Sequence, residues 1–211
     1  PASELDYSGQ HLLLLYGLKG DEYYWLKGEG DPYEAKGLGE TGRGLMKQVV
    51  LICVNAETRL KAIQAIRKEI NFNYPEFTST NEFINPLIDA TLERHPLLAD
   101  CFFSTMWKEL QYHDSRVAED VLKDMKARGQ PVLPVHDSFV VQDQYIEHLY
   151  ASMEEAYRML GIDSIPEVKL KKGANSDSNQ PSFKDLEIRI ENGRVRKEKE
   201  LEAVKKLEDF V

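Results

Sequence analysis

Two short runs of β-forming residues, Val132–Val135 and Phe139–Val141, are separated only by His136-Asp137-Ser138. This spacing predicts a tight β-hairpin whose tip carries a carboxylate. A further strand is expected at Ser3–Tyr7, with Asp6 close to its end. These strands are apolar enough to lie centrally in a sheet. If they are neighbours, two carboxylates that are 131 positions apart in the chain converge at one sheet edge.

The segment between these strands is dominated by helical patterns. Apolar residues recur every three or four positions, and glycine or proline follows several of the patterned stretches. The predicted helices start near Gln10 and carry Leu12–Tyr16, then cover Gly44–Ala56, a second stretch to about Ile70, Asn81–Arg94, Ala99–Tyr112, Asp114–Arg128 and Tyr145–Leu160. A glycine-rich loop is expected from Gly17 to Gly44.

The last part of the chain has a different pattern. A short strand is expected at Glu167–Lys171, and Leu186–Arg196 then alternates around Asn192-Gly193, a dipeptide typical of two-residue hairpins. Lys197–Phe210 is patterned as a charged helix. The predicted fold is α+β, an antiparallel sheet with a helical insertion and a small C-terminal hairpin-helix appendage. The predicted regions are 1–40, 41–98 (helical), 99–162 (helices and hairpin) and 163–211 (linker and appendage).

Composition excludes several classes of protein. With 211 residues, 42% of them apolar, the chain can bury a sizeable core and is not intrinsically disordered. Its longest apolar runs, Leu12–Leu15 and Val49–Val54, are far below the ~20 residues of a membrane span. We therefore expect no membrane partner and a cytoplasmic, intracellular location, and a viral or mobile-element origin fits this expectation.

Charge is unevenly distributed. The net charge of −9 argues against a general nucleic-acid coat protein. Residues 41–68, however, carry six basic side chains and one acidic side chain, which leaves −14 on the remainder. One basic element on an acidic body indicates a local anionic ligand, and the alternative is a solvated helix face.

The two aspartates suggest metal chemistry. Asp6 and Asp137 alone would bind Mg²⁺ poorly, because the ion prefers six oxygen ligands, but a bound triphosphate supplies further oxygens. Two Mg²⁺ ions, or Mn²⁺ in their place, would then hold the attacking and leaving oxygens of a phosphoryl transfer. The alternative is two unrelated aspartates in turns.

The basic element has a regular spacing. Arg43, Lys47, Leu51 and Asn55 recur every four residues and share one helical face. The two cations suit the phosphates of a nucleotide, Lys47 could neutralise or protonate leaving pyrophosphate, and Leu51 could lie under sugar or base. The alternative is a set of basic side chains that cover an apolar helix.

Taken in order, these motifs resemble those of family A DNA polymerases and single-subunit, phage-type RNA polymerases. Leu5-Asp6-Tyr7-Ser8 resembles the first carboxylate motif, and Arg43-Gly44-Leu45-Met46-Lys47 resembles the start of the fingers helix. Val135-His136-Asp137-Ser138-Phe139 is similar to the last motif, in the form found in the RNA polymerases. Gln111 through Asp120 is similar to the helix that contacts primer and minor groove. The resemblance covers roughly residues 4–145.

The resemblance implies a minimal palm and fingers, with a palm sheet that carries the aspartates. It makes Asp6 and Asp137 the metal-binding catalytic residues, and Lys47 a catalytic residue that also binds nucleotide. Gln111 and His136 would contact the primer-template. The implied nucleotide-binding residues are Arg43, Lys47, Leu51, Asn55 and His11.

The sequence also departs from the family pattern. His11 stands in the place of the sugar-selecting glutamate of the DNA polymerases, Asn55-Ala56 stands where Tyr-Gly is usual, and Ser138 replaces a glutamate. No thumb precedes Asp6 in this sequence, so a missing N-terminal region or a protein partner would supply one, or synthesis would be short and distributive. Binding of a duplex depends on the number of phosphate contacts.

Three functions remain open on these residues. The first is a template-directed nucleotidyltransferase that uses nucleoside triphosphates on a nucleic-acid primer-template, as in replication. The second is a catalytically degenerate polymerase fold that acts as a nucleic-acid- or protein-binding module. The third is a template-independent transferase or primase, which would use the same residues.

Overall fold

A computed structural model describes residues 2–20, 30–34, 37–162, 165–171 and 183–208. Much of the expected glycine-rich loop therefore lies outside the described residues, as does 172–182 of the expected linker. The elements are β1 (Ala2–Ser8), α1 (Gln10–Leu18), α2 (Gly39–Asn55), α3 (Arg59–Asn73), α4 (Asn81–Arg94), η2 (Pro96–Leu98), α5 (Trp107–Ala127), β2 (Val132–Val135), β3 (Ser138–Gln142), η3 (Asp143–Tyr145), α6 (Ile146–Met159), β4 (Glu167–Lys171) and α7 (Phe183–Glu208).

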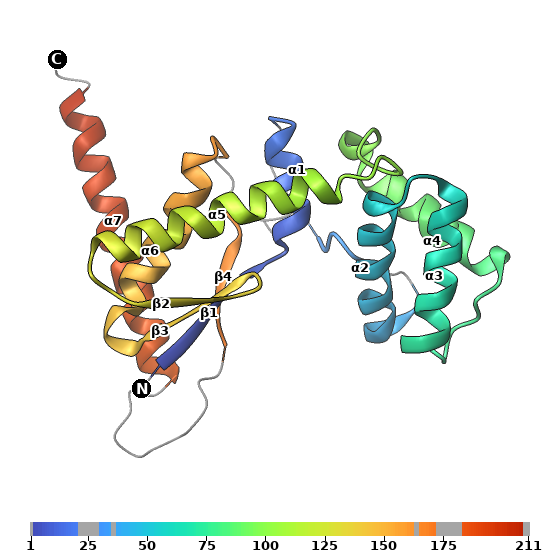
Figure 1. Ribbon diagram of the computed structural model, residues 1–211, viewed down its shortest axis with the longest axis horizontal. Helices are drawn as coiled ribbons and strands as arrows, with labels where there is room; N and C mark the ends of the chain where they lie inside the picture. The colour runs from blue at the N-terminus through green and yellow to red at the C-terminus, as the bar shows by residue number, and fades with distance from the viewer. Residues whose placement is uncertain (1, 21–29, 35–36, 163–164, 172–182, 209–211) are drawn as a thin grey trace. The chain divides into compact units, whose positions relative to one another are not determined.

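β1 and β3 form the interior of a four-stranded antiparallel sheet ordered β2-β3-β1-β4 (Figure 1). β1 pairs with β3 so that Leu5 lies opposite Phe139 and Asp6 opposite Ser138. The other neighbour of β1 is β4, whose bounds, Glu167–Lys171, are those predicted from the sequence. β2 and β3 form the expected hairpin, with Val135 opposite Ser138. The α+β class, the antiparallel sheet and the hairpin are thus confirmed.

Alternation along β1 gives the sheet two different faces. Leu5 and Tyr7 are buried on one face. Glu4 and Asp6 alternate with them along the strand, so they point to the other face, where they are half-buried. α6 packs on the apolar face, where the hydroxyl of Tyr7 donates to the backbone carbonyl of Met153 at 2.7 Å. We call the face that bears Glu4 and Asp6 the carboxylate face.

Residues 1–10 and 114–211 form one compact unit, and residues 11–113 form a second. In the second unit, α2, α3 and α4 pack against one another (Figure 1). Its buried core includes Leu45, Val49, Cys53, Ile66, Ile70, Ile84 and Ile88. The helical region predicted over 41–98 falls inside this unit, which also takes in 11–40 and 99–113.

The structure has a single helix, α5, in place of the two helices predicted over Ala99–Tyr112 and Asp114–Arg128. The segment before Trp107 is not helical, because Phe103 and Thr105 have positive φ and the Phe103 N–H donates to the Cys53 carbonyl at the end of α2 at 2.7 Å. From Trp107 the helix then continues through Asp114 without a break. Asp114 is not a helix cap, and its carboxylate accepts a hydrogen bond from the Gln10 side chain.

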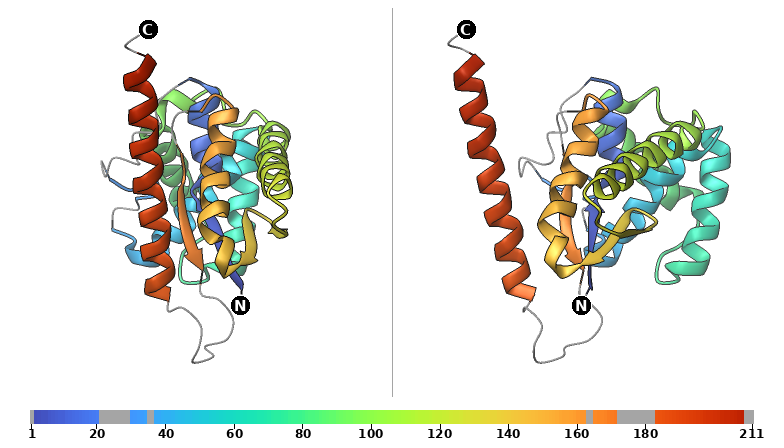
Figure 2. Two further views of the ribbon diagram at one scale, coloured as in Figure 1. Left: turned by 90° about the vertical axis from the view of Figure 1, so that its left-hand side faces the viewer. Right: turned by 60° about the vertical axis from the view of Figure 1, so that its left-hand side comes forward.

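The predicted hairpin at Leu186–Arg196 is wrong, because α7 runs without a break from Phe183 to Glu208. Its residues are mostly good helix formers, and tertiary contacts also favour the helix. Leu186 is buried, and Arg189 pairs with Glu147 of α6 at 3.2 Å. Figure 2 shows α7 as one long helix, and it packs on α6. The Asn-Gly signal for a turn is therefore overridden by helix propensity and packing.

Within the described part of the chain, no helix combines the length and apolar character that a membrane span requires.

Gly193 provides a test of α7. In a helix, Gly193→Ala removes backbone entropy from the unfolded state, and the new methyl group would lie 3.6 Å from the Glu147 side chain, an ordinary contact. We expect the free energy of unfolding, measured by urea denaturation, to rise by about 0.5–1 kcal/mol.

The matched control is Gly129→Ala, at a glycine whose φ is +67° with nothing close to the new methyl group. It should lower the free energy of unfolding by about 1–2 kcal/mol, because an L-residue is strained there. If Gly193→Ala were destabilising to a similar degree, the helical conformation at Gly193 would be wrong.

Candidate active site

Two carboxylates from distant parts of the sequence converge at one end of the sheet. Asp6 of β1 lies opposite Ser138, and Asp137 is the residue before Ser138, in the turn between β2 and β3. The backbone N–H of Tyr7 donates to the Asp137 carbonyl at 3.3 Å, which ties the turn to β1. The predicted juxtaposition of Asp6 and Asp137 is therefore present.

The turn itself is held by local contacts. His136 has a φ of +56°, in the left-handed region, and Asp137 does not, so the two-residue turn carries its strain on the histidine. The Ser138 hydroxyl is 2.8 Å from the Val135 carbonyl and 2.5 Å from Glu4 Oε1, to which it donates. His136 and Asp137 remain exposed, so this end of the hairpin is accessible to a ligand.

Asp6 is electrostatically frustrated. Burial raises the pKa of its carboxyl, and the negative charge of Asp137 raises this pKa further. Its Oδ1 atom is buried and has no hydrogen bond. The Lys171 ammonium opposes these effects from 3.4 Å. The charged form of Asp6 is thus incompletely stabilised by the protein alone.

Glu4 and Lys171 were missed by the sequence reasoning. Lys171 Nζ lies 3.0 Å from Glu4 Oε1, so that it contacts both carboxylates of β1 on this face. The Ser138 hydroxyl and Lys171 together lower the pKa of Glu4. Glu4 could have been found, because a residue two positions before Asp6 in a strand must share its face. The pairing that brings Lys171 to it has no local signal.

The donor set fits Mg²⁺ in part. Asp6 and Asp137 offer oxygens of the type Mg²⁺ prefers, and the buried Oδ1 of Asp6 has no hydrogen bond, although the Lys171 ammonium lies 3.4 Å from it. Among the described residues, no three His, Cys, Asp or Glu side chains form a group that could hold a metal ion by themselves. The two carboxylates alone would bind the ion weakly, and a ligand with its own anionic oxygens would complete the coordination and strengthen the binding.

The cationic stripe on α2 is arranged as predicted. Arg43, Lys47 and Asn55 are exposed and Leu51 is half-buried, whereas the opposite face of α2 is buried in its own unit. The Arg43 guanidinium makes two contacts with the Asp31 carboxylate, at 2.5 and 3.1 Å. An anionic ligand of Arg43 would have to compete with Asp31.

The segment Asp31–Glu34 is firmly attached to the same unit. Arg94 donates to the Asp31 carbonyl at 2.8 Å and pairs with Glu34. His95 is fully buried, and its ring lies 3.1 Å from the Pro32 carbonyl and 3.0 Å from the Tyr16 hydroxyl. Burial lowers the pKa of His95 to about 4, so this histidine is neutral at pH 7 and serves structure.

The remaining predicted residues, His11 and Gln111, are exposed on α1 and α5. Both belong to the unit formed by residues 11–113, whereas Asp6, His136 and Asp137 belong to the other. The structure thus gathers Asp6, Asp137 and His136 at one place, and Arg43, Lys47, Leu51 and Asn55 along one helix face.

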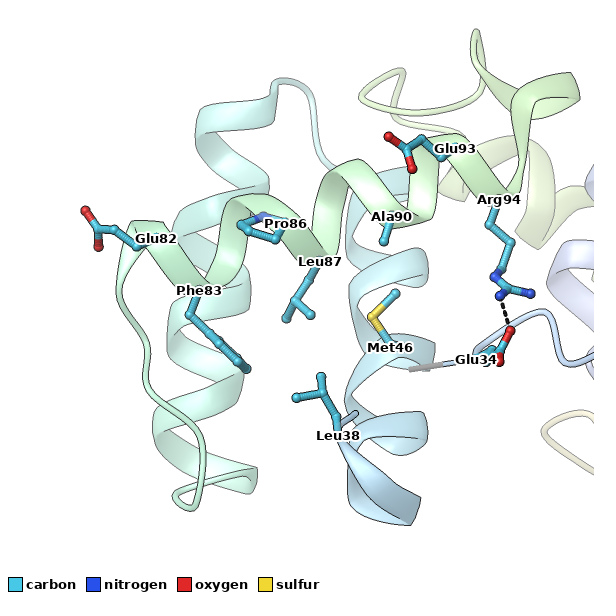
Figure 3. Close-up of a pocket in the computed structure, with 10 residues that line it drawn as sticks. All are labelled: Glu34, Leu38, Met46, Glu82, Phe83, Pro86, Leu87, Ala90, Glu93 and Arg94. Atoms are coloured by element: carbon cyan, nitrogen blue, oxygen red, sulfur yellow. Dashed lines mark hydrogen bonds and ion pairs between the residues drawn. The ribbon is translucent and has the colours of Figure 1, made fainter. Parts of the chain in front are cut away.

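A pocket of about 610 Å³ lies between α2 and α4. Figure 3 shows Phe83, Leu87 and Ala90 of α4 directed toward α2, with Arg94 and Glu34 paired at one end. The pocket is lined largely by apolar side chains, which also include Leu38, Met46 and Pro86. It offers a volume for an apolar group but no pair of groups suited to catalysis, so the carboxylate face is the better candidate.

Comparisons with known proteins add no assignment. No model of a known protein family matches the sequence, and a search of curated proteins finds no significant match. The geometry of the site is therefore what bears on the function of this chain.

Asp6→Asn should stabilise the metal-free protein at neutral pH. Because the pKa of Asp6 is raised in the folded state, the folded protein binds this proton more tightly, and stability is lost as pH rises through that pKa. Asparagine does not ionise, so the variant does not lose this stability as pH rises. We expect a higher melting temperature than wild type at pH 7 in EDTA, with the difference vanishing toward pH 3.

Glu4→Gln is the matched control, with the opposite sign. The pKa of Glu4 is lowered, so its stabilising effect is present above the unfolded-state pKa and disappears as pH falls through the folded-state value. This variant should melt below wild type at pH 7 and converge with it in acid. Equal shifts in the same direction for both variants would contradict the assignment of charges on this face.

Proposed function

We propose that this chain is a nucleotidyltransferase that transfers a nucleotide from a nucleoside triphosphate to a hydroxyl group, with a polymerase-like palm and fingers. The observation that carries the proposal is the convergence of Asp6 and Asp137, because two like charges with a half-buried member are costly unless a cation binds them. In the sequence, Asp6 precedes the cationic helix α2 and Asp137 follows it, and this is the order on which the resemblance to polymerases rests.

In the proposed reaction the attacking hydroxyl oxygen bonds to the α-phosphorus and gives its proton to water, and the bond between the α-phosphorus and the bridging oxygen breaks to release pyrophosphate. Asp6 and Asp137 would hold Mg²⁺, which supplies positive charge to the oxygens that carry negative charge in phosphoryl transfer. His136, exposed beside Asp137, would contact the end of the primer. Gln111 would contact the primer-template duplex.

Arg43 and Lys47 would bind the triphosphate. Their exposure on one face of α2 supports this role, because a guanidinium and an ammonium one turn apart can contact different phosphate groups. Lys47 Nζ could also donate a proton to the leaving pyrophosphate. Leu51 and Asn55 continue the stripe toward the sugar and base, and His11 would lie against the sugar.

The deciding experiment is extension of a labelled primer on a template, with Mg²⁺ or Mn²⁺ and with dNTPs and NTPs in separate reactions. We expect extension by the wild-type protein, and a loss of at least about a hundredfold in Asp6→Asn and Asp137→Asn, since removal of a metal-binding charge costs several kcal/mol of transition-state stabilisation. A reaction without template distinguishes template-independent transfer.

Circular dichroism of each variant shows whether the fold is retained. Lys169→Met is the active control, because the Lys169 ammonium pairs with Glu167 at 3.0 Å although its backbone lies opposite Asp6. Extension that survives in both aspartate variants would rule out the proposed site. If the wild-type protein binds a triphosphate with Mg²⁺ but does not extend, a thumb supplied by another region or by a partner becomes the next component to test.

Asp31 is expected to limit the affinity for triphosphate. Asp31→Asn keeps an acceptor for the Tyr33 N–H but removes the charge that pairs with Arg43. Affinity for ATP or dATP with Mg²⁺, measured by calorimetry, should rise about two- to fivefold, because exposed ion pairs contribute roughly 0.2–1 kcal/mol.

Arg43→Ala should lower that affinity, and Lys61→Ala, which removes a cation paired with Glu57, should leave it unchanged. A loss of affinity in Asp31→Asn would mean that the Arg43–Asp31 pair itself presents the cation to the ligand.

The second candidate function is a binding module that has kept a polymerase-like fold without catalysis. The observation in its favour is that the protein itself partly neutralises the charged groups of both predicted binding sites. Asp31 pairs with the Arg43 cation, and Lys171 contacts the Asp6 carboxylate. Absence of both extension and metal-dependent triphosphate binding would favour this function.

A further inference from the structure

Lys171 occupies a specific position on the carboxylate face. In the register of β4 and β1 it lies opposite Glu4, and its ammonium reaches 3.0 Å from Glu4 Oε1 and 3.4 Å from Asp6 Oδ1. The Asp6 atom that it approaches is the buried oxygen without a hydrogen bond. The contact therefore places a protein cation beside the one Asp6 oxygen that is buried without a hydrogen bond, and this oxygen can reach a metal ion only after the ammonium has moved away.

The neighbouring Lys169 shows that this contact is not a general property of a basic strand. Lys169 lies directly opposite Asp6 in the register, closer along the strand than Lys171. Its ammonium nevertheless pairs with Glu167 at 3.0 Å. Two lysines of the same strand and the same face thus contact different carboxylates.

A divalent cation and Lys171 cannot both bind Asp6 Oδ1 at contact distance. Two positive centres around one carboxylate oxygen repel each other, and in a half-buried site this repulsion is screened less than in bulk water. Lys171 has a second anchor in Glu4, which also accepts from Ser138. The ammonium can therefore leave Asp6 and keep a carboxylate partner.

We propose that Lys171 is an internal counter-ion of the Asp6–Asp137 pair, which a divalent metal ion must displace from Asp6 while the ammonium stays on Glu4. This inference rests on the proposed function, because it concerns the same metal site. It assigns Lys171 a regulatory role: the ammonium stabilises the metal-free sheet and sets the metal concentration at which the site fills.

The test compares Mn²⁺ binding by wild type, Lys171→Met, Lys171→Arg and Lys169→Met, with free Mn²⁺ measured by electron paramagnetic resonance at fixed ionic strength. Lys171→Met should bind about tenfold more tightly, as expected for removal of a unit charge a few ångströms from a divalent ion in a half-buried site. Lys171→Arg should stay near wild type. Lys169→Met, which removes the same charge from the same strand, should change affinity by less than about twofold.

Asp6→Asn separates this inference from the proposed function. If Mn²⁺ binding is unchanged in Asp6→Asn, the metal does not use Asp6, and both the proposed function and the role of Lys171 are wrong. If binding requires Asp6 but Lys171→Met and Lys169→Met bind alike, only the role of Lys171 is overturned.

A measurement on the wild-type protein avoids any effect of Lys171→Met on folding. Acetylation by a limiting amine-reactive reagent, followed by peptide mass spectrometry, reports how long each ammonium spends in an ion pair. Addition of Mg²⁺ should raise the labelling rate of Lys171, because its ammonium then keeps one carboxylate partner instead of two, and should leave that of Lys169 unchanged. Equal rates at Lys171 with and without Mg²⁺, at a concentration that saturates the site, would overturn displacement.

Discussion

The pairing of β1 with β3 is the interaction on which the candidate site depends. It joins a strand at one end of the chain to a strand more than 130 positions later, and its register places Asp6 opposite Ser138. A shift of this register by one residue would turn Asp6 toward α6 and Leu5 toward the carboxylate face. The burial of Leu5 and Tyr7 beneath α6 therefore fixes the position of the carboxylate as well as the core.

The same pairing sets the electrostatics of the site. A half-buried aspartate beside a second carboxylate weakens the folded state, and the protein compensates with Lys171 rather than with hydrogen bonds to Asp6 Oδ1. A hydrogen bond from a fixed donor would occupy the oxygen permanently. A lysine on a flexible stem compensates the charge and can still be displaced, which suits a site that must remain open to a ligand.

Local pattern was sufficient to predict the hairpin, the strand at Glu167–Lys171, the helix Asn81–Arg94 and the exposed stripe of α2, because periodicity and turn residues report on neighbours in the chain. It was not sufficient where tertiary contacts decide. α5 begins at Trp107 because the preceding backbone bonds to the end of α2, and Gly193 stays helical because α7 packs on α6. Lys171 reaches Asp6 only through the register of β4 with β1, for which the sequence has no local signal.

The hydrogen bond between Gln10 and Asp114 has a consequence for the order of folding. These residues stand at the two points where the chain passes into and out of the unit 11–113, so in the folded protein both ends of that insertion lie together. We expect the contiguous, helical insertion to fold first, since its contacts are local. The loop that β1 must then close to reach β3 shrinks from more than 130 residues to about 25, which saves about 1.4 kcal/mol of closure entropy. During synthesis on a ribosome, β1 would stay unpaired until residue 142 has emerged, and the Gln10–Asp114 contact would already have shortened the loop between β1 and β3.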